Sequence, residues 1–266
     1  ASLIYSKSII PELAEEDIQI VRLDDLSKSQ SDDLRRHFER DIFPVLTPLA
    51  VDPAHPFPYI SNLSLNLAVL LFDRNDQDLR FARVKVPSLL PRLQIVEEGR
   101  TFILLEELVA AHLHLLFPGM EISSHSSFRL TRNAVIDLNM QDSEDLREAM
   151  ASGILRRRIS SPAVRLEVAN DVAPEVTSLL HDELELDDKD TYSHDGPLDF
   201  QHLWELYQLT RHDLKSETWR PRTPKALSKR DGGKTSIFEV LRNQDVLLHH
   251  PYESFDASVV AFLEQA

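Results

Sequence analysis

Residues 43–58 read FPVLTPLAVDPAHPFP and hold five prolines within an otherwise apolar stretch. Proline fixes φ and has no backbone N–H, so this stretch can be neither the interior of a helix nor a central strand. Each residue before a proline is also pushed toward extended geometry. We therefore interpret the stretch as a rigid, partly buried strap that connects a helix to a sheet. The alternative is a strap that shapes a ligand tunnel or a subunit contact.

Helical spacing precedes this strap. Leu34, Phe38 and Ile42 follow one another at intervals of four, which places them on one face of a helix. Ser31 is the expected N-cap, because acidic residues follow it in the first turn. Pro44 should end the helix. Residues 1–29, upstream, are interpreted as a tail and connector with a short strand near 18–23.

Alternating spacing follows the strap. Apolar residues occur at every second position over residues 63–71, which predicts a long strand. Residues 81–86 should return antiparallel to it after the polar turn at 73–78. On this returning strand we expect Ala82, Val84 and Val86 to face inward. Arg83 and Lys85 should face solvent.

The remaining pattern mixes short strands and helices. The predicted strands are a hairpin formed by 93–96 and 100–104, then 120–131, 134–138, 163–168 and a short strand at Tyr192. The predicted helices are 106–117, 142–158, 175–184 and 198–209. This order predicts an α+β fold with a mixed, largely antiparallel sheet packed with helices.

The character of the chain changes after residue 209. Residues 210–235 are rich in basic residues, prolines and glycines, which is typical of a linker. Beyond it we expect a helix at 237–241, a strand at 246–249 and a helix at 255–266. Such an α-β-α piece cannot bury its own apolar faces, so we expect the natural chain to continue beyond Ala266.

Composition narrows the class of protein. The 266 residues suggest one or two domains, and the formal charge of 29 − 44 = −15 argues against a surface devoted to nucleic acid. No stretch is long and apolar enough to span a membrane. The first residues lack a basic region followed by an apolar run, so we expect no secretory signal. The absence of cysteine fits a cytoplasmic location, with peripheral attachment to a membrane left open.

Several local motifs have structural explanations. Gly233-Lys234-Thr235 is not a P-loop, because Ser228 stands where the first glycine is required. His112 and His114 are two apart on a predicted helix and cannot share a metal, so no metal site is expected. Residues 156–158, three arginines, either compensate a helix dipole or contact an anion. The acidic residues between 182 and 190 are interpreted as a solvated helix end.

Four stretches, in order, resemble the middle ("head") domain of type-one bacterial polyphosphate kinase. They are FPVLTPLAVDPAHPFPYISNLSLNLAVLL at 43–71, FRLTRNA at 128–134, PRTP at 221–224 and DVLLHHPYESF at 245–255. The resemblance implies an exit from an N-terminal helical domain at 1–10. It implies the head domain at 11–230, with a basic linker at 210–230, and the start of a first phospholipase-D-like domain at 231–266.

That family transfers the terminal phosphoryl group of ATP to polyphosphate, reversibly, through a phosphohistidine, with magnesium. Its catalytic groups belong to the C-terminal domains, so the resemblance implies no catalytic residue here and a phosphorylated histidine beyond residue 266. ATP and magnesium are expected in the full-length enzyme and not on this segment. The segment should contribute dimerisation and a tunnel wall. The residues expected at a polyphosphate-binding tunnel lip are Arg220, Arg222, Lys225, His249, His250 and Tyr252.

Two other functions stay open at this point. The chain could be an interaction module that forms a homodimer without contacting a ligand. It could also be a weak polyanion-binding module that uses residues 156–158 and the basic stretch 219–234.

Overall fold

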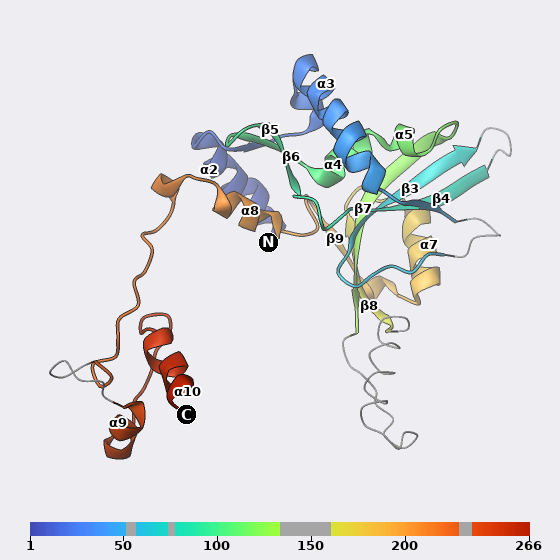
Figure 1. The fold of residues 1–266 in the computed structure, drawn as a ribbon. Coiled ribbons are helices and arrows are strands. Elements are labelled where there is room, and N and C mark those ends of the chain that lie inside the picture. The colour runs from blue at the N-terminus through green and yellow to red at the C-terminus, as the bar shows by residue number, and fades with distance from the viewer. Residues whose placement is uncertain (52–56, 74–77, 134–160, 229–235) are drawn as a thin grey trace, which may run out of the picture. The chain divides into compact units, whose positions relative to one another are not determined.

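The computed structural model describes residues 1–51, 57–73, 78–133, 161–228 and 236–266 (Figure 1). The chain divides into two compact units, Ala1–Leu209 and Thr210–Ala266. The strand predicted at 134–138, the helix predicted at 142–158 with its three arginines, and the Gly233-Lys234-Thr235 motif lie outside the described residues. The domain boundaries inferred from the resemblance stay predictions.

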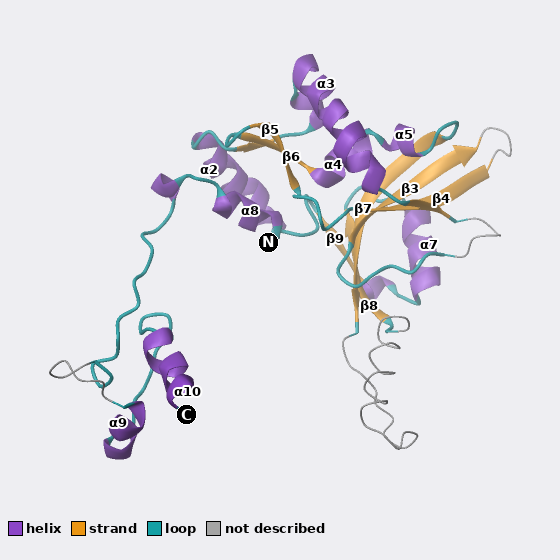
Figure 2. Ribbon diagram, in the orientation of Figure 1, coloured by secondary structure: helices purple, strands orange, loops and turns teal. Residues whose placement is uncertain are grey.

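The larger unit is built on two sheets (Figure 2). The six-stranded sheet has the order β2-β4-β3-β7-β8-β9, from Pro48–Ala50, Asp78–Lys85, Leu65–Asp73, Glu121–Arg132, Ala163–Ala169 and Thr191–His194. The three-stranded sheet has the order β1-β6-β5, from Gln19–Ile20, Thr101–Leu104 and Leu93–Glu97. Within each sheet one pair is parallel, β8 with β9 and β1 with β6. The expected α+β fold with largely antiparallel sheets is confirmed.

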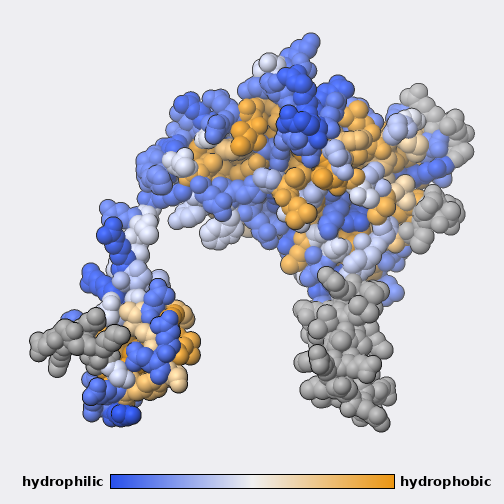
Figure 3. Space-filling view, in the orientation of Figure 1, coloured by the Kyte–Doolittle hydropathy of each residue, from blue (hydrophilic) through white to orange (hydrophobic). Residues whose placement is uncertain are grey.

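Strand β3 lies at the centre of the core and is buried on both faces. Leu65, Leu67 and Val69 pack into one cluster with helices α3 (Lys28–His37) and α4 (Leu105–Ala111). Ala68 and Leu70, on the opposite face, pack into a second cluster with helix α7 (Pro174–Leu184). The helices that cover the two faces are α3 (Lys28–His37), α4 (Leu105–Ala111), α5 (Leu113–Leu116) and α7 (Pro174–Leu184). In Figure 3 the outer surface of α3 is hydrophilic, as expected of a helix with one buried face.

The prediction that Arg83 faces solvent is wrong. Arg83 lies on the second buried face of the sheet and is only 6% exposed. Its Nε donates to Asn66 Oδ1 at 2.8 Å on the neighbouring strand. Burial lowers the pKa of the Arg83 guanidinium. The period-two spacing assigns the side chains of this strand to the correct two faces of the sheet. The second face is also covered by protein, however, so Arg83 is buried there, and Asn66 on β3 provides its hydrogen-bond acceptor.

The helix before the strap begins one turn earlier than predicted. Ser27, not Ser31, is the N-cap: its hydroxyl accepts from the backbone N of Gln30, and Gln30 Oε1 accepts from the backbone N of Ser27. This reciprocal capping box satisfies two backbone donors, an arrangement that Ser31 lacks. After α3 the chain continues through a π-helical turn, Phe38–Ile42, and a 3-10 turn, Phe43–Val45.

The strap adds the edge strand of the six-stranded sheet. Pro48–Ala50 pairs with β4, and the backbone N of Val51 donates to Phe81 O at 2.8 Å. Phe57 stacks on Phe81 with ring centroids 5.7 Å apart. An edge position suits proline, which cannot donate to a second neighbour.

Two predicted elements have different lengths. The single helix expected at 106–117 is broken at His112 into α4 and α5. The His112 ring stacks on Phe38 at 4.5 Å and its Nδ1 bonds to Leu108 O at 2.9 Å. The helix expected at 198–209 is shorter, α8 at His202–Gln208.

The N-terminal residues interpreted as a tail are helical. Their turns are α1 (Ser2–Ile4), a π-helical turn (Tyr5–Ile9) and α2 (Ile10–Glu15). Tyr5 anchors them, since its ring packs 5.2 Å from Phe200 and it is only 7% exposed. That contact joins residues almost two hundred positions apart in the chain, so a local sequence pattern could not predict it.

The smaller unit contains a 3-10 turn, His212–Leu214, then α9 (Ile237–Asn243), a π-helical turn (Asp256–Val260) and α10 (Ala261–Gln265). The strand predicted at 246–249 is absent, and these residues are irregular. A strand needs a neighbour for its backbone groups, and among the described residues this unit offers one isolated bridge, Arg222 with Glu253. Leu247 is consequently 91% exposed, and apolar side chains reach the surface of this unit in Figure 3.

Across the described ranges, every helix is too short or too polar to cross a membrane.

Candidate functional site

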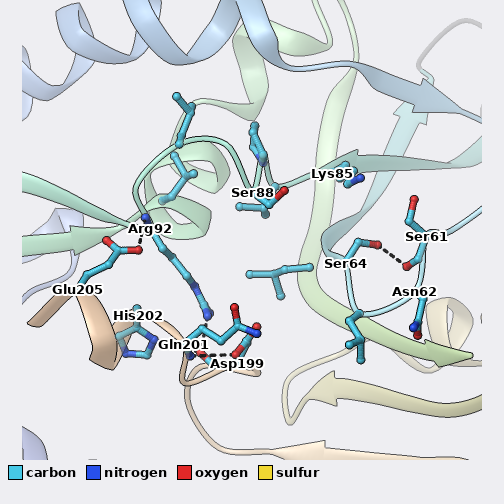
Figure 4. A pocket seen from close by; sticks show the side chains of 16 residues that line it. Ser61, Asn62, Ser64, Lys85, Ser88, Arg92, Asp199, Gln201, His202 and Glu205 are labelled. Atoms are coloured by element: carbon cyan, nitrogen blue, oxygen red, sulfur yellow. Dashed lines mark hydrogen bonds between the residues drawn. The ribbon is translucent and has the colours of Figure 1, made fainter. Parts of the chain in front are cut away.

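A cavity of about 320 Å³ lies within the larger unit (Figure 4). Three stretches far apart in the sequence form it: the turn before β3, the end of β4 with the loop that follows, and the start of α8. The lining residues are Ser61, Asn62, Leu63, Ser64, Leu65, Lys85, Val86, Pro87, Ser88, Leu90, Arg92, Leu105, Asp199, Gln201, His202 and Glu205.

A buried ion pair forms one wall. Arg92 Nη2 lies 2.5 Å from Glu106 Oε1, and the two side chains are only 12% and 8% exposed. Arg92 Nε also faces the same carboxylate, at 3.2 and 3.1 Å from its two oxygens. Arg92 Nη1 donates to Asp199 O. The guanidinium therefore joins α4 to the loop before α8 and has its charge compensated by Glu106.

Glu205 holds the start of β5 in place. Its Oε1 accepts from the backbone N of Arg92 and its Oε2 from the backbone N of Leu93, both at 2.9 Å. These two donors would otherwise be unpaired in a partly buried position. Glu205 thus uses both of its carboxylate oxygens on the backbone.

His202 also lines the cavity, and its relative exposure is 0%. Its Nδ1 lies 3.0 Å from Asp199 O and its Nε2 lies 3.2 Å from the Tyr5 hydroxyl. Burial lowers the pKa of His202, with the Arg92 charge acting in the same direction. The imidazole is therefore neutral, so Nδ1–H donates to the carbonyl and Tyr5 donates to Nε2. Burial also raises the pKa of Tyr5 to about 12.

The turn before β3 has a left-handed residue. Leu63 has φ of 58°, and its backbone N donates to Leu130 O at 2.7 Å. The Ser64 hydroxyl donates to Ser61 O at 2.7 Å and tightens the turn. Asn62 Oδ1 accepts from the backbone N of Arg132 at 2.8 Å. These bonds fix the turn against β7 in a conformation that leucine rarely adopts.

A second charged network lies beside the cavity on β7, β8 and β9. Arg129 Nη1 donates to Glu167 Oε2 at 2.8 Å, and Arg129 Nε lies 3.8 Å from Asp199 Oδ2. His194 Nε2 lies 3.5 Å from Glu167 Oε1. Arg129 therefore balances part of the charge of Asp199, which lines the cavity.

The smaller unit brings together four of the six residues predicted at a polyphosphate-binding lip. The backbone N of Arg222 donates to Tyr252 O at 3.0 Å, and the Tyr252 ring lies 4.8 Å from the His249 ring. His250 Nδ1 bonds to Glu253 O at 2.8 Å. Arg222, Tyr252, His249 and His250 therefore share one loop region.

The other two predicted residues are exposed on the segment that leads to this region. Arg220 and Lys225 flank Arg222 in the sequence, and both side chains face solvent. In the described part of the chain, neither side chain forms an ion pair. Trp219, which is not one of the six predicted lip residues, packs edge-on to Tyr252 with ring centroids 5.3 Å apart. The exposed rings of Trp219 and Tyr252 thus contact each other in this region, and Arg220, Arg222 and Lys225 are exposed on the segment that begins at Trp219.

Sequence reasoning missed the cavity. The Ser61–Leu65 segment falls within the first stretch that resembles the kinase family, which is the signal that could have indicated it. Arg92, Asp199 and Glu205 had no such signal, because they come together only through the packing of α8 against β5.

Comparison with known proteins identifies the chain. Residues 29–206 match the sequence model described as "Polyphosphate kinase middle domain". The chain belongs to the polyphosphate kinase family. Polyphosphate kinases of Mycobacterium tuberculosis and Mycobacterium bovis are 46% identical to it over 277 aligned residues, which cover 99% of this chain. That of Mycobacterium ulcerans is also 46% identical.

A solved structure agrees in fold. The polyphosphate kinase of Porphyromonas gingivalis superposes with a TM-score of 0.71 over 98% of this chain, at 23% identity. The chain spans 37% of the length of that protein and of the mycobacterial relatives. The resemblance recognised in the four sequence stretches is therefore confirmed.

Proposed function

We propose that this chain is the middle segment of an ATP:polyphosphate phosphotransferase and supplies framework and substrate-path surface, while the phosphohistidine chemistry belongs to other parts of the enzyme. The observation that carries the proposal is the match of residues 29–206 to the middle domain of the family. ATP and polyphosphate are the proposed substrates of the whole enzyme.

The charge distribution supports a framework role. Among the described residues of the larger unit, the least exposed arginines are engaged with protein groups: Arg92 with Glu106, Arg129 with Glu167, and Arg83 with Asn66. A phosphoryl-transfer centre needs cationic groups free to face the transferred phosphate. Arg222 and its exposed neighbours in the smaller unit fit the predicted tunnel lip better, because their charges are available to an anion.

Magnesium would need oxygen ligands that converge. Among the residues that the structure describes, no group of three His, Asp or Glu side chains is placed to hold a metal ion. We propose that magnesium, like ATP, is bound by other parts of the enzyme.

A homodimer is part of the proposal. Trp204 and Tyr207 on α8 are 69% and 60% exposed, and their rings pack edge to face at 6.2 Å. Large aromatic side chains at the surface are typical of protein contacts. A cytoplasmic location stays a prediction from the cysteine-free sequence.

Incubation of the 266-residue chain with γ-labelled ATP tests the central claim. We expect no acid-labile, base-stable phosphoprotein and no polyphosphate. Stoichiometric phosphohistidine on this chain would overturn the assignment of catalysis to other parts of the enzyme. If the chain binds polyphosphate, and if this binding weakens with added salt and in Arg222→Gln, the result would support the proposed tunnel lip around Arg222.

A further inference from the structure

We propose that the cavity in the larger unit binds a small oxyanion, a phosphate or carboxylate group, with Lys85 as its counter-ion. The proposal concerns a site separate from the Arg222 region and does not depend on the phosphotransferase assignment. It rests on the unpaired ammonium of Lys85, on the free hydrogen-bond donors of the cavity wall, and on the rigidity of the groups that shape it.

Lys85 is the charged group of the cavity wall that lacks a bonded partner among the described residues. Of the other charged groups in the wall, Arg92 is paired with Glu106, and Asp199 lies 3.8 Å from Arg129 Nε. Glu205 has both oxygens bound to backbone N–H groups. Within the described residues, the Lys85 ammonium has no hydrogen-bond or ion-pair partner, although its side chain is half-buried. A bound anion would supply the partner that this ammonium lacks.

Free donors accompany this cation. In the described part of the chain, the side chains of Ser61, Ser88 and Gln201 form no hydrogen bond, and all three line the cavity. In the view of Figure 4 the Lys85 side chain is drawn between those of Ser88 and Ser61. Hydroxyl and amide donors next to an ammonium group suit the several oxygens of a phosphate or carboxylate.

The wall also contains apolar groups, which strengthen the attraction between the Lys85 ammonium and an anion. Val86, Pro87 and Leu105 line the cavity together with the polar side chains. Low-polarity surroundings strengthen the attraction between an ammonium and an anion compared with open water. The volume, about 320 Å³, is near the lower end for small-molecule sites, so the ligand is small.

The Ser61–Ser64 turn at the edge of the cavity is held in a strained conformation. Leu63 keeps a left-handed backbone although it is not glycine, and it is 46% exposed instead of buried in the core. Bonds to Leu130 and within the Ser61–Ser64 turn maintain this conformation. Strained backbone that the surroundings enforce is concentrated at ligand sites, and here it aims a turn with two serines at the cavity.

Calorimetric titration of the 266-residue chain with pyrophosphate, orthophosphate and citrate at constant ionic strength tests the proposal. We expect at least one probe to bind with a Kd of roughly 10 mM or tighter. Lys85→Gln should weaken that binding by about tenfold or more, because it removes a charge-assisted bond. The matched control is Lys28→Gln, an exposed lysine at the start of α3, which should leave the affinity unchanged.

Amide chemical shifts locate the bound probe. Shifts confined to residues 61–65 and 85–90, which persist in Arg222→Gln, support the cavity and separate it from the proposed tunnel lip. Preference for pyrophosphate over citrate would identify the ligand class as a phosphate, and the reverse preference a carboxylate. The proposal is wrong if no probe saturates, or if the Lys85→Gln chain binds the probe as tightly as the unaltered chain.

Discussion

Removal of the Glu106 carboxylate should destabilise the larger unit strongly. Glu106→Ala leaves the Arg92 guanidinium, only 12% exposed, without its counter-ion. Breaking a buried ion pair by removing one partner typically costs about 3–5 kcal/mol. Arg92 keeps its bond to Asp199 O, so we expect the lower end, about 3 kcal/mol. For a unit of this size, that lowers Tm by roughly 6–12 °C.

Thermal unfolding followed by circular dichroism or calorimetry measures this effect. Glu98→Ala is the matched control, since it is the same substitution at an exposed position in the β5–β6 turn, and we expect a change within about 0.5 kcal/mol. The milder Glu106→Gln keeps one acceptor and should fall between the two. Removing both charges with Arg92→Met and Glu106→Leu should recover much of the loss, because no uncompensated charge is then buried.

A Tm for Glu106→Ala within about 2 °C of the Glu98→Ala control would refute this reasoning. Such a result would mean that water reaches Arg92 in the folded protein and that the pair contributes as a surface pair does.

Two further predictions concern other buried polar groups. Burial raises the pKa of Tyr5 to about 12 in the folded protein, compared with about 10 in the unfolded chain. Above about pH 10 the unfolded state therefore loses a proton that the folded state keeps, so the free energy of unfolding falls as pH rises. Between pH 9 and pH 11 the free energy of unfolding, measured with urea, should fall by ~1 kcal/mol more in the unaltered chain than in Tyr5→Phe. Equal decreases in the two chains would contradict this prediction. Asn66→Leu removes the acceptor of Arg83 Nε and should cost about 2–3 kcal/mol, whereas Asn66→Leu with Arg83→Met should recover most of it. Unchanged stability in the single variant would show that Arg83 does not need Asn66.

The parts of the fold that could be predicted rest on local periodicity. The β3–β4 and β5–β6 hairpins and α7 with proline in its first turn follow from spacing and turn residues within each element. The strap was recognised because proline restricts the backbone wherever it stands. Errors occurred where a long-range contact outweighed the local pattern. The 1–29 segment is partly helical because Tyr5 docks on Phe200, and the strand expected at 246–249 has no neighbour to pair with.

The candidate cavity could not be predicted in the same way. Lys85 looks in the sequence like any outward-facing residue of a strand, and Arg83 has the same pattern two positions earlier. One is buried against Asn66 and the other lines a cavity, because the second face of the sheet is covered near Arg83 and open near Lys85. Only the packing of neighbouring elements decides between these outcomes.

The amino-acid sequence by itself determined the family, the α+β class and the order of most strands and helices, since motif identity and side-chain periodicity are properties of neighbouring residues. The tertiary structure decided which charges are paired and which are left to face a cavity. Pairing depends on distances between residues such as Arg92, Glu106 and Asp199, which are far apart in the chain and become neighbours only when the two sheets and α8 pack together.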